Sequence, residues 1–150
     1  MNITPSCPVR FEPTTWLLVF SKKSAKPLHR WFYLGQYKHV FAVGYIEALD
    51  VWIGYEIGIF TTEVFVMTKY VGCETIEKYA RFSTIIAYTP KKQKKFPFWG
   101  KFCFWCSPAI SCLVGLGCAV TPDQLFRYSL KNGGTVYSRN TDHGCLTSFK

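Results

Sequence analysis

The chain has 150 residues, of which 49% are hydrophobic and 18% charged, so its composition excludes an intrinsically disordered protein and fits a single domain. Lysine and arginine outnumber aspartate and glutamate by 18 to 9, which gives a net charge of +9 at pH 7. This excess suits an anionic partner such as nucleic acid, a lipid surface or an acidic protein, and it is equally compatible with solubility alone. Aromatic residues form 18% of the chain, so we expect some of them to line a cleft or a partner surface.

The N-terminal segment carries no recognisable targeting signal. Residues 1–14 contain three prolines and little periodicity, which predicts an irregular arm. Without an apolar leader, the seven cysteines are expected to be thiols in a reducing compartment. No apolar run approaches the roughly 18 residues that a membrane span needs, so we expect a soluble intracellular protein.

The first two thirds of the chain predict an antiparallel sheet of about five strands. Segments rich in β-branched and aromatic residues predict strands at 15–20, 39–47, 51–58, 63–70 and 82–88, and residues 30–33 allow a further short strand. Leu49 and Asp50 predict a hairpin turn between the segments 39–47 and 51–58. Thr75 is a plausible cap for a single helical turn over 75–81.

Residues 89–100 interrupt the strand pattern with a cluster of positive charge. Four lysines fall within five positions and repel one another, which predicts an exposed loop; they are Lys91, Lys92, Lys94 and Lys95. The sequence Phe96-Pro-Phe-Trp-Gly follows them. The segment is therefore either a solvated connection or a nucleic-acid or polyanion-binding loop with aromatic side chains at its tip.

The sharpest local signal is the helix start Thr121-Pro-Asp-Gln. Threonine stands at the N-cap, proline at the first helical position and glutamine three residues after the cap, as in a capping box. The helix is predicted to end at Asn132-Gly133-Gly134. Residues 15–134 would then form a single domain, followed by a loose polar tail over 135–150.

The segment 102–117, Phe-Cys-Phe-Trp-Cys-Ser-Pro-Ala-Ile-Ser-Cys-Leu-Val-Gly-Leu-Gly, allows three kinds of cysteine chemistry. Cys103 and Cys106 have the spacing of a zinc knuckle, but no second pair at matching spacing follows. The same pair resembles a thioredoxin-type dithiol, although no βαβ unit surrounds it. Neither metal nor another cofactor is therefore expected.

The third possibility is a nucleophilic thiol. Cys106 stands at the predicted N-terminus of a helix with Pro108 in its first turn, where the macrodipole favours the thiolate. His39 opens a predicted strand, and Glu56 falls near its diagonal neighbour position on the next strand. A carboxylate at that position would hold the imidazole in the tautomer that accepts the thiol proton.

Four short motifs together resemble small phage-encoded papain-like proteins related to circularly permuted NlpC-type and lecithin retinol acyltransferase-like cysteine peptidases. The motifs are Lys38-His-Val-Phe-Ala-Val, Val51-Trp-Ile-Gly-Tyr-Glu, Cys106 with Gly115 nine residues later, and Thr121-Pro-Asp-Gln-Leu-Phe-Arg-Tyr. In the permuted order the histidine strand precedes the cysteine helix, as it does here. Ser111 replaces a basic residue often seen five positions after the nucleophile, and Cys112 is an unexpected second thiol.

The resemblance implies an α+β, papain-like fold in which an antiparallel sheet packs against the nucleophile helix and a second C-terminal helix. It implies a peptidase or amidase with Cys106 as nucleophile, His39 as base and Glu56 as the orienting residue, acting on a protein or peptide in the host cytoplasm or in the virion. The alternative is a non-catalytic virion component, or an inhibitor that binds a host factor through the same scaffold.

Overall fold

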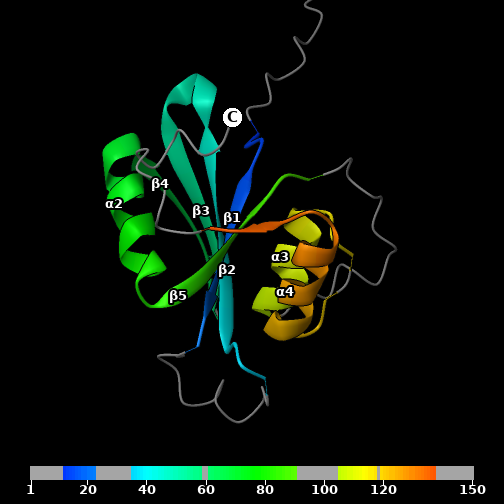
Figure 1. Ribbon diagram of the computed structural model, residues 1–150. Helices are drawn as coiled ribbons and strands as arrows, with labels where there is room; N and C mark the ends of the chain where they lie inside the picture. Colours follow the sequence, from blue (N-terminus) through cyan, green and yellow to red (C-terminus); the bar gives the residue numbers. More distant parts are fainter. Residues whose placement is uncertain (1–11, 23–34, 59–60, 91–104, 118, 138–150) are drawn as a thin grey trace, which may run out of the picture.

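The fold is α+β, with one open antiparallel sheet and helices on both of its faces (Figure 1). The computed structural model describes residues 12–22, 35–58, 61–90, 105–117 and 119–137. Within these residues the strands are β1 (Trp16–Ser21), β2 (His39–Ile46), β3 (Val51–Ile57), β4 (Thr62–Thr68), β5 (Ser83–Tyr88) and β6 (Thr135–Val136). The helices are α2 (Lys69–Ala80), α3 (Cys106–Leu113) and α4 (Pro122–Lys131). The sheet order is β4-β3-β2-β1-β5-β6.

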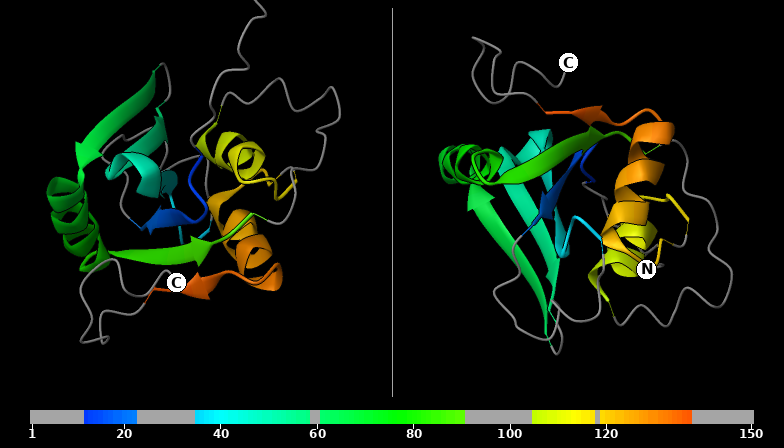
Figure 2. Two further views of the ribbon diagram at one scale, coloured as in Figure 1. Left: turned by 90° about the horizontal axis from the view of Figure 1, so that it is seen from above. Right: turned by 60° about the horizontal axis from the view of Figure 1, so that its bottom comes forward.

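The central strands are buried on both faces. Leu18 and Val40 belong to the core under α3 and α4, whereas Leu17 and Phe41 belong to the core under α2. Figure 2 shows α2 on one side of the sheet and the other two helices on the opposite side. Because successive residues of a strand point to opposite faces, a strand covered on both sides is apolar throughout. This explains why β1 appears in the sequence as an unbroken apolar run.

Helix α2 corrects the prediction for residues 63–81. The structure ends β4 at Thr68 and begins the helix at Lys69, whereas the sequence predicted a strand to residue 70 and only one helical turn, capped by Thr75. The start of the helix contains a β-branched residue and Gly72, which are weak helix formers. Gly72 is required by packing, since a Cβ there would lie 2.0 Å from Cδ1 of Trp52. Tertiary contact therefore overrides local preference.

The hairpin formed by β2 and β3 is closed at one end and open at the other. Its turn is a 3-10 segment, η1 (Glu47–Leu49), followed by Asp50 at φ 52°, so it is longer than the predicted two-residue turn. The strands pair from Ile46 opposite Val51 to Ala42 opposite Tyr55. Beyond that point β2 stays paired with β1 and β3 stays paired with β4. The two strands therefore separate toward the start of β2.

Helix α4 confirms the prediction made from the capping motif. The Thr121 side chain accepts a hydrogen bond from the Gln124 amide, and the helix ends with Asn132 as its C-cap. The chain then forms β6, which pairs with β5, so the expected loose tail does not begin at residue 135. This short strand raises the sheet to six strands. The predicted strand at 30–33 and residues 138–150 lie outside the described residues.

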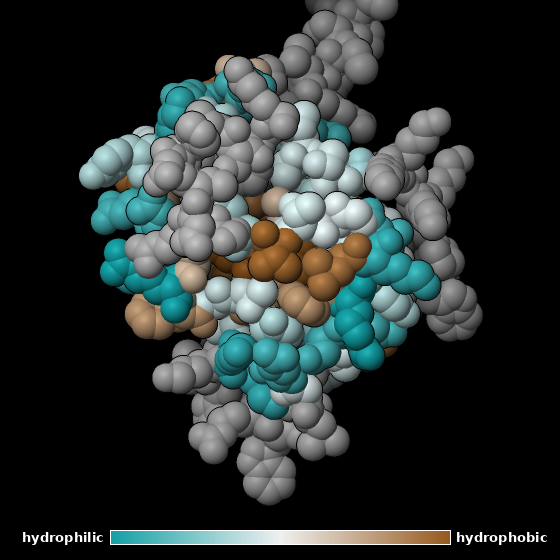
Figure 3. All heavy atoms as spheres, in the orientation of Figure 1, coloured by the Kyte–Doolittle hydropathy of each residue, from teal (hydrophilic) through white to brown (hydrophobic). Residues whose placement is uncertain are grey.

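The surface of the described domain includes apolar side chains around β6 and α4. Figure 3 shows apolar side chains together near the middle of the face that is turned to the viewer. Val136 and Leu130 are among the exposed residues of β6 and α4. None of the helices in the described ranges has the length and apolar character needed to cross a membrane.

Candidate active site

Cys106 is the first residue of α3. Trp105 precedes it as an extended N-cap, with φ −126° and ψ 154°, and its indole has no oxygen with which to cap the helix. Pro108 lies in the first turn, where the absence of a backbone N–H costs no helical hydrogen bond. The amides of Cys106 and Ser107 therefore have no intrahelical acceptor. Two N–H donors thus stand beside the thiol at the positive end of the helix.

The orientation of α3 comes from its apolar side chains and its glycine-rich end. Ala109, Ile110 and Val114 belong to the core on this face of the sheet. Two glycines follow the helix, and both adopt positive φ, Gly115 at 70° and Gly117 at 88°. The helix ends at Leu113, and its N-terminus is held against the open end of the β2–β3 hairpin.

His39 and Glu56 face each other across that open end. The Nε2 atom of His39 lies 2.9 Å from Oε1 of Glu56, within hydrogen-bond distance. Continuing the strand register would place Glu56 opposite Phe41 and therefore diagonal to His39, as the sequence predicted. The side chain of His39 is 15% exposed and that of Glu56 is 37% exposed. The imidazole is thus shielded while the carboxylate still contacts water.

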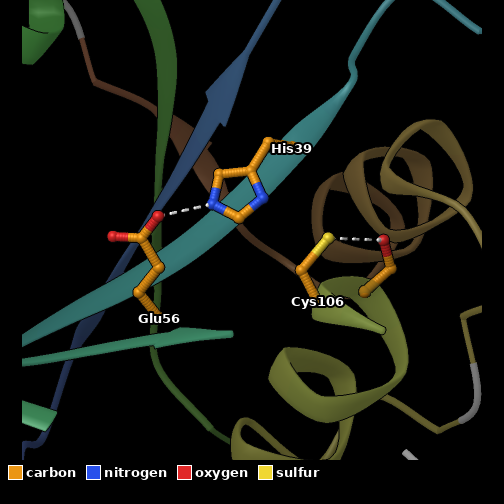
Figure 4. Close-up of polar contacts among 4 residues, drawn as sticks. His39, Glu56 and Cys106 are labelled. Atoms are coloured by element: carbon orange, nitrogen blue, oxygen red, sulfur yellow. Dashed lines mark hydrogen bonds and ion pairs between the residues drawn. The ribbon is translucent and has the colours of Figure 1, made fainter. Parts of the chain in front are cut away.

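The thiol of Cys106 lies on the other side of the His39 ring. Figure 4 shows Glu56 beside one ring nitrogen, with the second nitrogen on the side of Cys106. Sγ of Cys106 interacts with His39 and with the backbone N–H of Val40, and it lies 3.9 Å from the Ser107 hydroxyl. Val40 is available because β2 has separated from β3 here. The structure therefore brings all three sequence-predicted residues together.

The electrostatics of the site favour an ion pair. Burial alone would lower the pKa of His39, but hydrogen bonds and charge interactions with Cys106 and Glu56 outweigh it and raise the pKa to about 9. Burial would raise the pKa of the Cys106 thiol, but His39, Val40 and Ser107 together hold that pKa below its ordinary value. His39 is therefore protonated at neutral pH, and the thiolate is favoured beside it.

Helix α4 fixes the chain that leads into His39. The carboxylate of Asp123 accepts hydrogen bonds from the backbone amides of Gln36 and Tyr37, at 3.0 and 3.3 Å. The Tyr37 hydroxyl donates to Thr84 on β5 at 3.0 Å. The sequence identified Asp123 only as part of a helix start. Gln36 and Tyr37 precede Asp123 by 87 and 86 positions, so no local sequence signal predicts these hydrogen bonds.

Ser111 has a structural role at the end of α3, and Cys112, the second thiol, lies on the same helix. The Ser111 hydroxyl is buried, donates to the Gly117 carbonyl and accepts from the Ala119 amide at 3.2 Å. It therefore ties the connection between α3 and α4, a role that a basic side chain could not fill in that buried position. Cys112 lies on α3 and is partly exposed.

Two tryptophans differ in burial: Trp52 is buried under α2, whereas Trp105 is exposed next to Cys106. Lys91, Lys92, Lys94 and Lys95 lie outside the described residues, so the polyanion-binding loop stays a prediction. In the described ranges no three His, Cys, Asp or Glu side chains are grouped to hold a metal ion. No disulfide links the cysteines found there, Cys73, Cys106 and Cys112.

No family model, curated protein or solved structure matches the chain. Its chemistry must therefore be inferred from the site itself. A buried imidazolium beside a thiol, with a carboxylate on its far nitrogen, has the composition of an activated cysteine nucleophile. Helix amides beside the sulfur can stabilise an oxyanion. Acyl transfer to sulfur is the reaction class that uses both features.

Proposed function

We propose that this protein is a cysteine peptidase or amidase of papain-like type, acting through a thioester intermediate. The observation that carries the proposal is the chain of contacts from Glu56 through His39 to Cys106 at the N-terminus of α3. The order of histidine strand before cysteine helix supports the permuted papain-like relationship. The phage origin, and a location in the host cytoplasm or the virion, rest on the sequence resemblance alone.

The reaction follows from the charge states of the pair. The Cys106 thiolate attacks the carbonyl carbon, a C–S bond forms, and the carbonyl oxygen becomes an oxyanion facing the first-turn amides. Collapse of this intermediate breaks the C–N bond, and the His39 imidazolium gives its proton to the departing amine. The imidazole then takes a proton from water, whose oxygen attacks the thioester. The acid leaves and the ion pair is restored.

Glu56 acts in this scheme by holding the ring. Its hydrogen bond to Nε2 leaves Nδ1 directed to the sulfur side, and its negative charge stabilises the imidazolium (Figure 4). The carboxylate stays ionised throughout. It is therefore a positioning residue, whereas His39 and Cys106 exchange the proton.

The first test is alkylation of the folded protein by iodoacetamide near neutral pH, with each site measured by peptide mass mapping. Cys106 is expected to react faster than Cys73 and Cys112 although it is only 3% exposed, because its thiolate is stabilised. In His39→Ala this preference should disappear. Slow, uniform labelling of the three thiols in the parent protein would contradict the proposal.

The second test detects the covalent intermediate. Incubation with p-nitrophenyl acetate should give an acetyl group on Cys106 that is lost again as acetate, with continuing release of p-nitrophenol. Cys106→Ser should abolish both, and urea-unfolded parent protein controls for ordinary thiol reactivity. Acetylation without turnover would indicate a reactive thiol that is not an enzyme.

The near-complete burial of Cys106 favours a second candidate, a binding protein on the same scaffold. Such a protein would act as a virion component or as an inhibitor of a host factor. It requires the fold but not the thiolate. Cys106→Ser would then keep the biological effect, whereas the peptidase would lose it.

A further inference from the structure

The two edges of the sheet are protected very differently. At one edge β6 contributes only two residues, which pair with Ile86 and Ala87 of β5. At the other edge β4 has seven residues in continuous register with β3, from Thr62 opposite Ile57 to Thr68 opposite Val51. The described part of the chain places no further strand beyond β4. Within that part of the chain its outer backbone groups have no strand partner, and an edge of this kind can pair with another strand.

The side chains of β4 divide by face. Phe65 covers Gly54, where a Cβ would lie 2.1 Å from the ring, and Met67 packs into the core under α2. Val64 and Val66 point to the opposite face and are 60% and 66% exposed. On that face helix α3 packs against β2 and β3, so it does not cover Val64 and Val66. The strand has no proline or bulge, and Glu63 is its single charge.

We infer that β4 is an interface through which two copies of this chain pair antiparallel, edge to edge, about a two-fold axis at Phe65. That centre is the one register in which all seven residues find partners, because Phe65 is the middle residue of the strand. Each Val64 then faces Val66 of the second copy, and each Val66 faces Val64. The two apolar pairs cover the exposed valines of both copies.

The single charge selects this register over its neighbours. In the chosen register Glu63 faces Met67 of the second copy. A shift that centres the axis on Glu63 would place two carboxylates directly opposite and would leave most of the strand without partners. Pairing through β4 also closes on itself, because a two-fold contact uses the same strand edge of both copies. A closed dimer follows, and not a fibre.

The overall charge predicts how salt acts on this contact. Each copy carries a net charge of +9, so two copies repel one another at low ionic strength. Added salt screens that repulsion and leaves the apolar pairs and backbone hydrogen bonds in place. Association should therefore strengthen with sodium chloride, the opposite of an ion-pair interface.

The test is sedimentation equilibrium of the whole chain over about 5 to 500 µM, a range suited to weak interfaces of small area. The parent protein, 17.3 kDa as a monomer, should approach twice that mass. Val66→Lys should stay monomeric because it places two charges beside the shared edge. Val120→Lys is the matched control, since Val120 is 59% exposed but lies outside the strand, and it should still dimerise. Circular dichroism and thermal unfolding verify that each variant is folded.

The register is tested separately by cross-linking. Val64→Cys and Val66→Cys chains, mixed in equal amounts with a short bis-maleimide, should link residue 64 of one copy to residue 66 of the other. Peptide mapping distinguishes this product from links through the native cysteines. A parent chain that remains monomeric throughout the concentration range overturns the inference and leaves the edge to an extended peptide of another protein. Dimers that survive Val66→Lys overturn it equally.

Discussion

The β2–β3 hairpin has a group of interacting polar side chains at each end, and the two groups differ in burial and in their pKa shifts. At the open end His39 and Cys106 are shielded from water, whereas the Glu56 carboxylate still contacts it. At the turn the Tyr45 hydroxyl donates to Asp50, whose carboxylate lies 3.3 Å from Nζ of Lys69. Hydrogen bonding to Asp50 raises the pKa of Tyr45 and of Lys69, and the Tyr45 hydrogen bond lowers the pKa of Asp50.

The turn cluster already holds its ordinary charges at pH 7, and each of these shifts moves a pKa further from neutrality. The shift at His39 instead carries its pKa from 6.5 to about 9, across neutral pH. Hydrogen bonds join the side chains at both ends. Burial beside an ionisable thiol distinguishes the open end, because shielding from water strengthens each charge interaction.

The largest expected effect comes from breaking the buried chain. His39→Ala should lower the rate of p-nitrophenyl acetate hydrolysis by about 100-fold or more, since it removes the proton carrier and the counter-charge of the thiolate. Asp50→Asn is the matched change at the turn and keeps a residue that tolerates the positive φ of 52°. Its rate should stay within about twofold of the parent rate, because the turn takes no part in the proposed proton transfer. An equal loss of hydrolysis rate in His39→Ala and Asp50→Asn would contradict the assignment of the reaction to the open end of the hairpin.

The pH profile sharpens the same contrast. Alkylation of Cys106 should rise with pH at lower pH than for an ordinary thiol, because its pKa is lowered. Ester hydrolysis should fall again as pH rises through about 9, where the imidazolium loses its proton. In His39→Ala burial acts without a counter-charge and raises the thiol pKa, so the alkylation midpoint should move up.

Alkylation and hydrolysis rates of the parent and His39→Ala, measured at half-unit pH intervals, check both the predicted rise and the predicted fall. Cys73 in the same samples supplies the internal control for reagent reactivity. An unchanged midpoint in the variant would show that His39 does not set the ionisation of Cys106.

A smaller effect is expected at Glu56. Glu56→Gln keeps a hydrogen-bonding side chain but removes the negative charge, so the His39 pKa should fall below about 9 and hydrolysis should slow by about tenfold. Glu63, directly opposite Glu56 on β4, provides the matched control. An NMR titration of the His39 ring should show the shift in Glu56→Gln and little change in Glu63→Gln. A larger shift of the His39 pKa in Glu63→Gln than in Glu56→Gln would mean that Glu63 is the orienting carboxylate.

The smallest effect is expected at the exposed end. Lys69→Gln removes one partner of Asp50, yet both side chains are well exposed and their attraction is screened by water and salt. Urea unfolding should therefore give the same midpoint as the parent within experimental error. A clear loss of stability would mean that the turn cluster contributes to folding, contrary to its exposure.

The sequence predicted the elements whose signals are local. The capping motif located α4, and the apolar run of β1 located a central strand. The hairpin pattern of the sequence also places Glu56 diagonal to His39, because both strands and the turn between them have local signals. Helix α2 was underestimated because Gly72 serves Trp52, a residue on another element. The two-residue β6 is too short to show periodicity, and it forms because β5 offers it an edge.

The supporting contacts of the site were not predictable for a related reason. Asp123 holds the segment before His39, and Ser107 adjoins the thiol, but neither residue type at that position signals such a partner. Val40 contributes an amide because β2 separates from β3, which depends on the whole sheet order. Long-range geometry decides these contacts.

The separation of β2 from β3 has a consequence for the order in which the candidate site assembles. His39 and Glu56 are 17 residues apart and meet within one hairpin, whereas Cys106 follows His39 by 67 residues (106 − 39) and belongs to a helix that must dock into the open end. Contacts between distant residues form late because their loop-closure entropy must be overcome first. We therefore expect a chain still being synthesised to carry an ordinary thiol, whose pKa falls only when α3 packs against the sheet.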